Sequence, residues 1–312
     1  MPYIAVPSAP GDELLRTAQA RWDAIFAARA DLEPALDLQR RLLTLVIELA
    51  GTIDAGRLPR LSLPPKYVAT KLTRGVPVFS GEPIPLPVKV LHASLVRLCG
   101  ALAKGGAGEP AEHIRSAIES GSIEAGSLLA ASLARDRAAI RTGAVHRGLA
   151  PDLVWLVAEL AVSPFAHALQ RAVFWGGARG AVENVAALSG WNRGYCPACG
   201  SWPALAEVVA GRRVLRCSFC ALAWELTAYS CIYCEEDGEA FVVAAPDEAR
   251  KDRRLELCGR CSGYLKTVDV SELSPFPLLA IADLDTMDLD LAAMERGYAR
   301  PMLREFTRSP RP

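Results

Sequence analysis

The chain has 312 residues, of which 51% are hydrophobic, so it is long enough for two domains and apolar enough for a sizeable core. Its 35 basic and 35 acidic residues balance, which argues against an overall field that draws it to nucleic acid or to an anionic membrane. Residues 1–11 contain no basic segment followed by an apolar stretch, so we expect no secretory signal.

The first part of the chain, to about residue 188, has the periodicity of helices. Leu14, Ala18 and Trp22 recur at four-residue steps, which places them on one helical face. Prolines crowd the stretch 54–87 and predict extended loop structure there. The sequence therefore predicts one helix-rich domain, with helices over about 14–26, 33–50, 88–104, 110–120, 125–141 and 152–175.

One apolar stretch, Leu153 to Ala178, is the nearest approach to a membrane span. Glu159, Pro164 and Arg171 interrupt it, and a helix that crosses a bilayer would tolerate such residues poorly. We therefore expect no membrane span. The stretch is predicted to be a buried helical hairpin of a soluble protein, kinked or split at Pro164 and ended by the glycines at 176 and 177.

A turn-rich linker at 189–194 marks a change of composition. Short strand-like runs follow at 204–209, 213–216, 222–228 and 240–245, each beside a cysteine pair, and the segment 276–306 returns to a helical pattern. Asp283, Asp285 and Asp288 are interpreted as capping and dipole-matching residues of that last helix. The predicted fold class is α+β. A helix-rich domain (1–188) precedes tandem rubredoxin-like or zinc-ribbon modules (189–268) and a C-terminal helical segment (269–312).

Four Cys-x-x-Cys pairs carry the most specific signal. In a protein that is not exported thiols stay reduced, so clustered pairs indicate metal binding or catalysis rather than disulfides. A Cys-x-x-Cys turn points both sulfurs at one position, and two such turns enclose a tetrahedral ion. The ninth cysteine, Cys99, lies on an apolar stretch and is interpreted as a small buried hydrophobe. The predicted metal ligands are Cys196, Cys199, Cys217, Cys220, Cys231, Cys234, Cys258 and Cys261.

The spacing of the pairs bears on how they combine. Seventeen residues separate Cys199 from Cys217 and 23 separate Cys234 from Cys258, so each gap has room for a hairpin. Consecutive pairs are thus predicted to share an ion, with a cross-brace of first with third and second with fourth as the alternative. Four thiolates leave no open position for substrate, as in structural sites, and they accept zinc and iron alike.

Signals for other chemistry are weak. The sequence lacks a Gly-x-Gly-x-x-Gly after a strand, a phosphate-binding loop and a Gly-x-Ser-x-Gly motif. The four histidines (His92, His113, His146 and His167) are scattered and are interpreted as surface or satisfied core residues. Ten basic and ten acidic residues lie between Trp191 and Val268, without the basic excess of a nucleic-acid module. The basic run 250–254 is interpreted as a solvated loop. A zinc-ribbon nucleic-acid-binding or transcription-associated protein remains the alternative function.

Several strings resemble the formate dehydrogenase accessory proteins, the FdhE family. The resemblance is specific over roughly 190–306, although 221–225 departs from the family pattern, and it is loose over the helical part. The strings that carry it are Arg74-Gly75-Val76-Pro77, Cys196-Pro197-Ala198-Cys199-Gly200-Ser201-Trp202-Pro203, Arg213-Val214-Leu215-Arg216-Cys217-Ser218-Phe219-Cys220 with Trp224, Leu257-Cys258-Gly259-Arg260-Cys261-Ser262-Gly263-Tyr264-Leu265-Lys266, and Leu289-Asp290-Leu291-Ala292-Ala293-Met294-Glu295-Arg296-Gly297-Tyr298-Ala299-Arg300.

The resemblance implies a cytoplasmic, non-enzymatic maturation factor. Such a factor binds the catalytic subunit of a respiratory, molybdenum-containing formate dehydrogenase before export, and it carries rubredoxin-like sites that hold iron. Two metal ions per chain are expected, with iron favoured by the resemblance and zinc as the other candidate. A homodimer is left open. Arg260 and Lys266 are expected to be surface residues near the cysteine turns.

Overall fold

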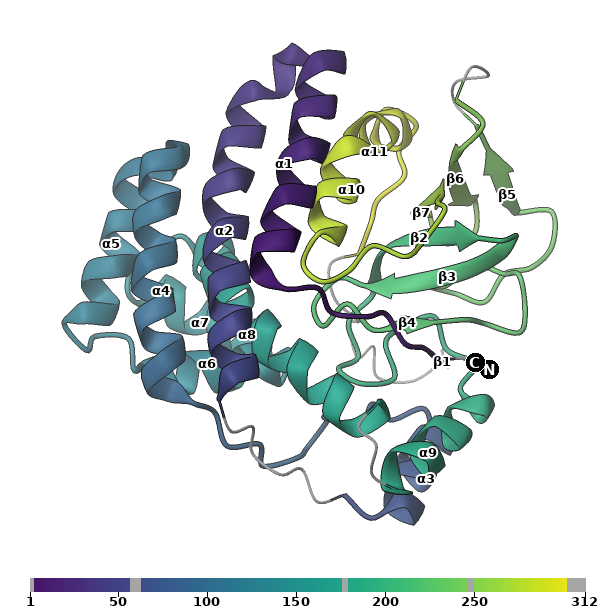
Figure 1. Cartoon of the computed structure of the whole chain (residues 1–312), viewed down its shortest axis with the longest axis horizontal. Helices are drawn as coiled ribbons and strands as arrows, with labels where there is room; N and C mark the ends of the chain where they lie inside the picture. The colour runs from purple at the N-terminus through teal and green to yellow at the C-terminus, as the bar shows by residue number, and fades with distance from the viewer. Residues whose placement is uncertain (1–2, 57–62, 176–178, 246–249, 302–312) are drawn as a thin grey trace.

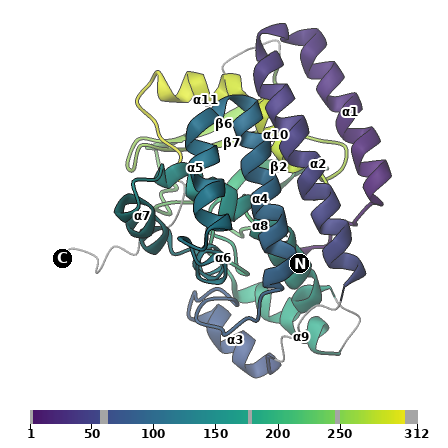
Figure 2. The ribbon, with the colours of Figure 1, turned by 90° about the vertical axis from the view of Figure 1, so that its left-hand side faces the viewer.

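Helices make up the first half of the computed structural model, which describes residues 3–56, 63–175, 179–245 and 250–301 (Figure 1). Helices α1, α2, α4 and α5 stand side by side, and the view from their side places the sheet behind them (Figure 2). The helices are α1 (Gly11–Ala28), α2 (Glu33–Ala55), α3 (Pro65–Thr73), α4 (Val88–Leu102), α5 (Gly108–Glu119), α6 (Ala125–Leu133), α7 (Arg137–His146), α8 (Pro151–Phe174), α9 (Arg179–Ala187), α10 (Leu279–Asp285) and α11 (Met287–Met294).

Strands of the second half join the first residues of the chain in one seven-stranded sheet of order β1-β4-β3-β2-β7-β6-β5. Two similar units build it, since β2 and β3 form one antiparallel hairpin and β5 and β6 form another. A parallel pair, β2 with β7, joins the units, so the tandem modules share a single sheet. The strands are β1 (Tyr3–Ile4), β2 (Pro203–Val209), β3 (Arg212–Cys217), β4 (Ala223–Trp224), β5 (Phe241–Ala244), β6 (Arg253–Cys258) and β7 (Gly263–Asp269).

Helix α8 is the centre of the main core. It runs unbroken through Pro164, so the predicted split into a hairpin is wrong, while the alternative of a kink at that proline stays a prediction. An 18-residue window of α8 has the length and hydropathy of a membrane span, but 72% of the window is buried inside the protein, as in the core helix of a soluble protein. Phe165 and Leu169 of α8 pack in one cluster with Leu215 of β3 and Trp224 of β4, so a continuous core connects helices and sheet. The predicted division into three segments remains a proposal.

Two local predictions in the helical part are wrong. The stretch 54–87 contains helix α3, because Pro64 and Pro65 stand at its start, where a missing N–H costs nothing. The helix predicted over 125–141 is two helices, α6 and α7. Arg135 between them has a φ of +60°, and the Asp136 side chain accepts a hydrogen bond from Ala139 N at 2.9 Å and begins α7. The glycines at 176 and 177 and the predicted helical end at 302–306 lie outside the described residues.

The C-terminal helices are fastened to the sheet by ion pairs. Asp283 pairs with Lys266 of β7 and with Arg300, each at 2.7 Å, and Asp285 pairs with Arg253 of β6. The capping interpretation of Asp283 and Asp285 is therefore wrong, while Asp288 does lie in the first turn of α11. Arg253 is 7% exposed at the start of β6, so the basic run is not wholly a solvated loop.

Candidate metal centres

Eight sulfur atoms gather at two positions, on turns that flank the strands of the sheet. Cys196, Cys199, Cys217 and Cys220 form the first centre, and Cys231, Cys234, Cys258 and Cys261 form the second. In each centre the four sulfurs lie within 4.8 Å of one another. The grouping is that of consecutive pairs and not the cross-brace. It follows from the fold, because in each unit one pair precedes a hairpin and the next pair follows it.

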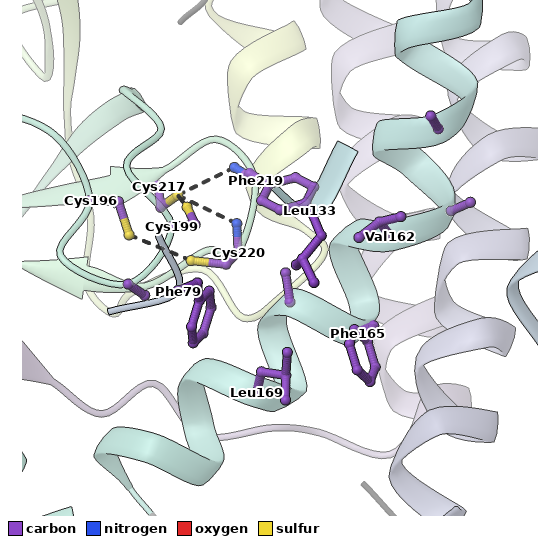
Figure 3. Close-up of a cluster of buried hydrophobic side chains, with 14 of the residues drawn as sticks. Phe79, Leu133, Val162, Phe165, Leu169, Cys196, Cys199, Cys217, Phe219 and Cys220 are labelled. Atoms are coloured by element: carbon purple, nitrogen blue, oxygen red, sulfur yellow. Dashed lines mark hydrogen bonds between the residues drawn. The ribbon is translucent and has the colours of Figure 1, made fainter. Parts of the chain in front are cut away.

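The sulfur separations suit a tetrahedral ion. In the first centre Sγ of Cys196 lies 3.6 Å from that of Cys220, and Cys199 Sγ lies 3.4 Å from Cys217 Sγ (Figure 3). In the second centre the corresponding distances are 3.7 Å (Cys231 to Cys261) and 3.5 Å (Cys234 to Cys258). Metal–sulfur bonds of about 2.3 Å place tetrahedral ligands about 3.8 Å apart, whereas a disulfide needs about 2.05 Å. The four-sulfur sets therefore fit zinc or ferrous iron and no disulfide.

All four turns share one backbone geometry. The residue after the second cysteine has a positive φ in each, at Gly200 (83°), Ala221 (54°), Glu235 (64°) and Ser262 (54°). In the second turn the amides of Phe219 and Cys220 both donate to Cys217 Sγ at 3.4 Å. The sequence predicted this geometry only at Gly200, because glycine alone adopts a positive φ without strain. The other three residues adopt the left-handed region at a cost of about 1–2 kcal/mol each, so their identity does not predict it.

The loop after α3 covers the first centre. Val78 N donates to Pro197 O at 2.8 Å, and Phe79 N donates to Ala198 O at 2.9 Å, so the loop extends the Cys196–Cys199 turn by backbone hydrogen bonds. The loop itself is held by Lys71, which is 7% exposed. Its ammonium group donates to Val78 O (2.9 Å), Ser80 O (2.6 Å) and the Glu82 carboxylate (2.6 Å). These three bonds use all three N–H donors of the lysine.

Two side chains of the helical half, one from α8 and one from the connection between α6 and α7, reach the other turn of the first centre. His167 of α8 lies 2.9 Å from the carbonyl oxygen of Cys220 through Nδ1 and stacks on Phe276. Burial lowers the pKa of His167 to about 4, so the ring is neutral at neutral pH, and Nδ1 carries the hydrogen because a carbonyl can only accept. The Arg135 guanidinium lies 4.0 Å from the ring centroid of Phe219, a residue that stands between Cys217 and Cys220 in the sequence.

The second centre is more open. Cys231 and Cys258 are buried, but Cys234 is only half-buried and Cys261 is exposed. Its contact with the first unit is close: a Cβ on Gly194 would lie 2.0 Å from Ile232 O, so the segment just before Cys196 touches the Cys231–Cys234 turn at a position that only glycine fits. Beyond Cys261, Ser262 O accepts a hydrogen bond from Ala299 N at 2.8 Å.

Both centres contain thiols whose pKa is raised by burial. Burial raises the pKa of Cys196 and of Cys220 well above the ordinary thiol range. The same cause raises the pKa of Cys261 to about 11. In each centre one thiol has the opposite shift: burial raises the pKa of Cys199 and of Cys258, but hydrogen bonds from neighbouring thiols or backbone amides outweigh burial and lower it. An ion entering either centre would displace the protons of the thiols whose pKa is raised.

A solved structure, that of the FdhE protein from Pseudomonas aeruginosa, matches with a TM-score of 0.56 and 24% sequence identity over 97% of this chain and 98% of that one. The chain has the FdhE fold. Curated proteins named Protein FdhE also match in sequence, at 33% identity in Escherichia coli O127:H6 and 32% in Escherichia fergusonii. Those matches span 121 residues, 38% of this chain and 38% of each relative. No family model matches.

The remaining sequence predictions can be placed within this FdhE fold. Cys99 is buried at 1% exposure on α4, as predicted, far in the chain from both centres. His167 is the satisfied core histidine that was expected, and His113 lies on the surface of α5 beside Glu109. Sequence reasoning missed Lys71 and Arg135 as parts of the first centre. Single basic residues in helical segments give no signal of that kind, since only the folded chain brings them to the cysteine turns.

Proposed function

We propose that this chain is a cytoplasmic, non-enzymatic accessory protein that binds the catalytic subunit of a respiratory formate dehydrogenase during its assembly. In this proposal the eight clustered cysteines hold two ions, with iron favoured and zinc as the other candidate. The observation that carries it is the pair of four-sulfur centres within an FdhE fold. When bound, the ions would supply folding free energy to a unit with little core of its own.

The ligand sets support binding rather than turnover. Each centre offers four sulfurs, and a tetrahedral ion with four protein ligands has no position left for substrate or water. The neutral His167 is engaged with a backbone carbonyl and stacked on Phe276, so it is not poised as a general base towards solvent. Bound ions would therefore stabilise the fold around them, and we assign the client-binding role to the exposed face beside the second centre.

Charge pairing argues against the nucleic-acid alternative. Most of the basic side chains between Trp191 and Val268 lie within 4.0 Å of a carboxylate, which neutralises the groups that would bind phosphate. Those paired side chains are Arg193, Arg212, Arg213, Arg216, Arg253, Arg254, Arg260 and Lys266. Arg216 and Lys266 are also fully buried.

Co-purification with the client tests the proposal. The tagged full chain should retain the formate dehydrogenase catalytic subunit from an extract, and deletion of its gene should lower respiratory formate oxidation without changing transcription of the enzyme. Normal formate oxidation in the deletion strain, or retention of a defined nucleic acid at moderate salt, would contradict it.

Charge reversal separates contact from folding. Arg260 is exposed beside the second centre, so Arg260→Glu should leave the fold intact and weaken client retention if that face contacts the client. Arg41→Glu, at an exposed position on α2, is the matched control. Lys266 does not serve this purpose, because the expectation that it lies on the surface is wrong: its side chain is 0% exposed between Asp283 and Asp290.

A further inference from the structure

The two centres differ in how the rest of the protein encloses them. All four cysteines of the first centre belong to the main core cluster, together with Phe165 and Leu169 of α8 and Phe79 of the covering loop (Figure 3). None of the four cysteines of the second centre belongs to that cluster in the described part of the chain, although the neighbouring Ile232 does. Both sets have the same ligands and similar sulfur separations, so the difference lies in the surroundings and not in the ligand chemistry.

Contacts from the helical half close the first centre on both sides. The loop at Val78 and Phe79 bonds to the backbone of the first turn, and His167 bonds to the carbonyl of Cys220 in the second. Arg135 lies over Phe219 and forms a 2.6 Å ion pair with Glu159 of α8, which fixes the same turn from a third direction. A competing ligand can reach these sulfurs only after helix and sheet separate, and such an opening has a free energy close to that of global unfolding.

The second centre has an open side. Cys261 is exposed, and Cys234 is half-buried. The side chain beside them, Arg260, is 66% exposed and pairs with Glu236 at 3.2 Å, a surface pair that contributes little rigidity. A ligand from solution can therefore attack this ion at Cys261 without unfolding of the sheet.

We propose that the two centres have different roles: the first is a permanent joint between helices and sheet, and the second is an exchangeable site for a soft divalent cation. Cys261 is the first ligand to leave, followed by Cys234. This inference rests on the proposed metal binding and goes beyond it, since it assigns uptake and release of an ion to the second centre alone.

Release of the ion to a chelator tests the division. The full chain, loaded with zinc under reducing, anaerobic conditions, is mixed with excess 4-(2-pyridylazo)resorcinol, and the coloured complex is followed with time. We expect two phases of one ion each, the slower by at least about tenfold. Alkylation by iodoacetamide at the end of the fast phase should modify Cys231, Cys234, Cys258 and Cys261 and spare the first set.

Two variants assign the phases. Cys261→Ser should purify with one ion and show only the slow phase. Glu82→Gln loosens the loop over the first centre, and it should accelerate the slow phase while the fast phase stays unchanged. Release of both ions in one phase, a fast phase that labels Cys196 or Cys217, or a slow phase missing from Cys261→Ser would overturn the assignment. None of these readouts involves the client, so failure here is distinct from failure of the accessory function.

Discussion

The imidazole of His167 donates a hydrogen bond from Nδ1 to the carbonyl oxygen of Cys220, across 2.9 Å and 53 positions of sequence. The residues come from the central helix and from the second cysteine turn, so this bond is one of those that join the helical half to the first centre. Because both groups are buried, loss of the donor would leave the carbonyl without a partner in an apolar setting.

His167→Ala should accordingly lower the free energy of unfolding by about 2–4 kcal/mol, from the unpaired carbonyl and the space left under Phe276. Urea denaturation of the metal-loaded protein measures the change. The control is His113→Ala, whose side chain is 62% exposed on α5, with an expected effect within about 0.5 kcal/mol. Equal effects at both positions would show that the bond to Cys220 contributes nothing.

Arg135→Ala removes a guanidinium group that lies 4.0 Å from the ring centroid of Phe219 and 4.6 Å from that of Trp155. It also leaves the Glu159 carboxylate without its ion-pair partner. The expected loss is about 2–4 kcal/mol of unfolding free energy. Arg171→Ala is the matched control, because Arg171 lies over the exposed ring of Trp175 and should lose about 1 kcal/mol or less. A loss at Arg135 no larger than at Arg171 would contradict a supporting role at the first centre.

Two glycine substitutions should have opposite signs. Gly200 has a φ of +83°, and a Cβ there would lie 3.1 Å from Pro77 of the covering loop, so Gly200→Ala should cost about 1–3 kcal/mol. Gly100 lies inside helix α4, and apart from its chain neighbours and the backbone of its own helix no described atom lies within 4 Å of a Cβ built on it, so Gly100→Ala should stabilise by about 0.5–1 kcal/mol. Thermal unfolding at fixed metal content compares the two. A stabilising Gly200→Ala would refute the turn geometry.

Acid should weaken the ion pair between Lys71 and Glu82, which holds the loop over the first centre. Burial raises the pKa of Glu82, but the hydrogen bonds from Lys71 and Tyr67 outweigh it and hold the pKa below the ordinary 4.5. A carboxyl with a lowered pKa contributes stability above its unfolded pKa, and that contribution is lost as the pH falls through the lowered value. The difference in unfolding free energy between the wild type and Glu82→Gln should therefore be constant above about pH 5 and shrink below 4.5.

Urea titrations of both proteins from pH 7 to pH 3 measure that difference. Release of metal in acid is common to the two proteins and cancels in the comparison. The control pair is the wild type and Glu48→Gln, at a surface ion pair with Arg97 where both side chains are about half exposed. A Glu82 difference that does not vary with pH would mean that the carboxylate charge contributes nothing to the loop over the first centre.

What the sequence by itself determined is local. The Cys-x-x-Cys spacing and the hairpin-length gaps were enough to predict the two four-cysteine groups, because a short turn and a hairpin bring their own ends together whatever surrounds them. Periodicity likewise placed helices such as α2 and α4 within a few residues. Prolines were misleading at both Pro65 and Pro164, since one begins a helix and the other is accommodated inside one.

Only the tertiary structure decided how the two groups differ. Whether a cysteine turn is enclosed depends on which distant surfaces meet it, and the residues that enclose the first centre, Lys71, Arg135 and His167, carry no local mark of that role. The same holds for Asp283, whose partners Lys266 and Arg300 come from strand and tail. A carboxylate can cap a helix at the surface or pair with a cation in the interior, and its sequence neighbours do not distinguish the two. Its place is set by the long-range contacts that remove it from water.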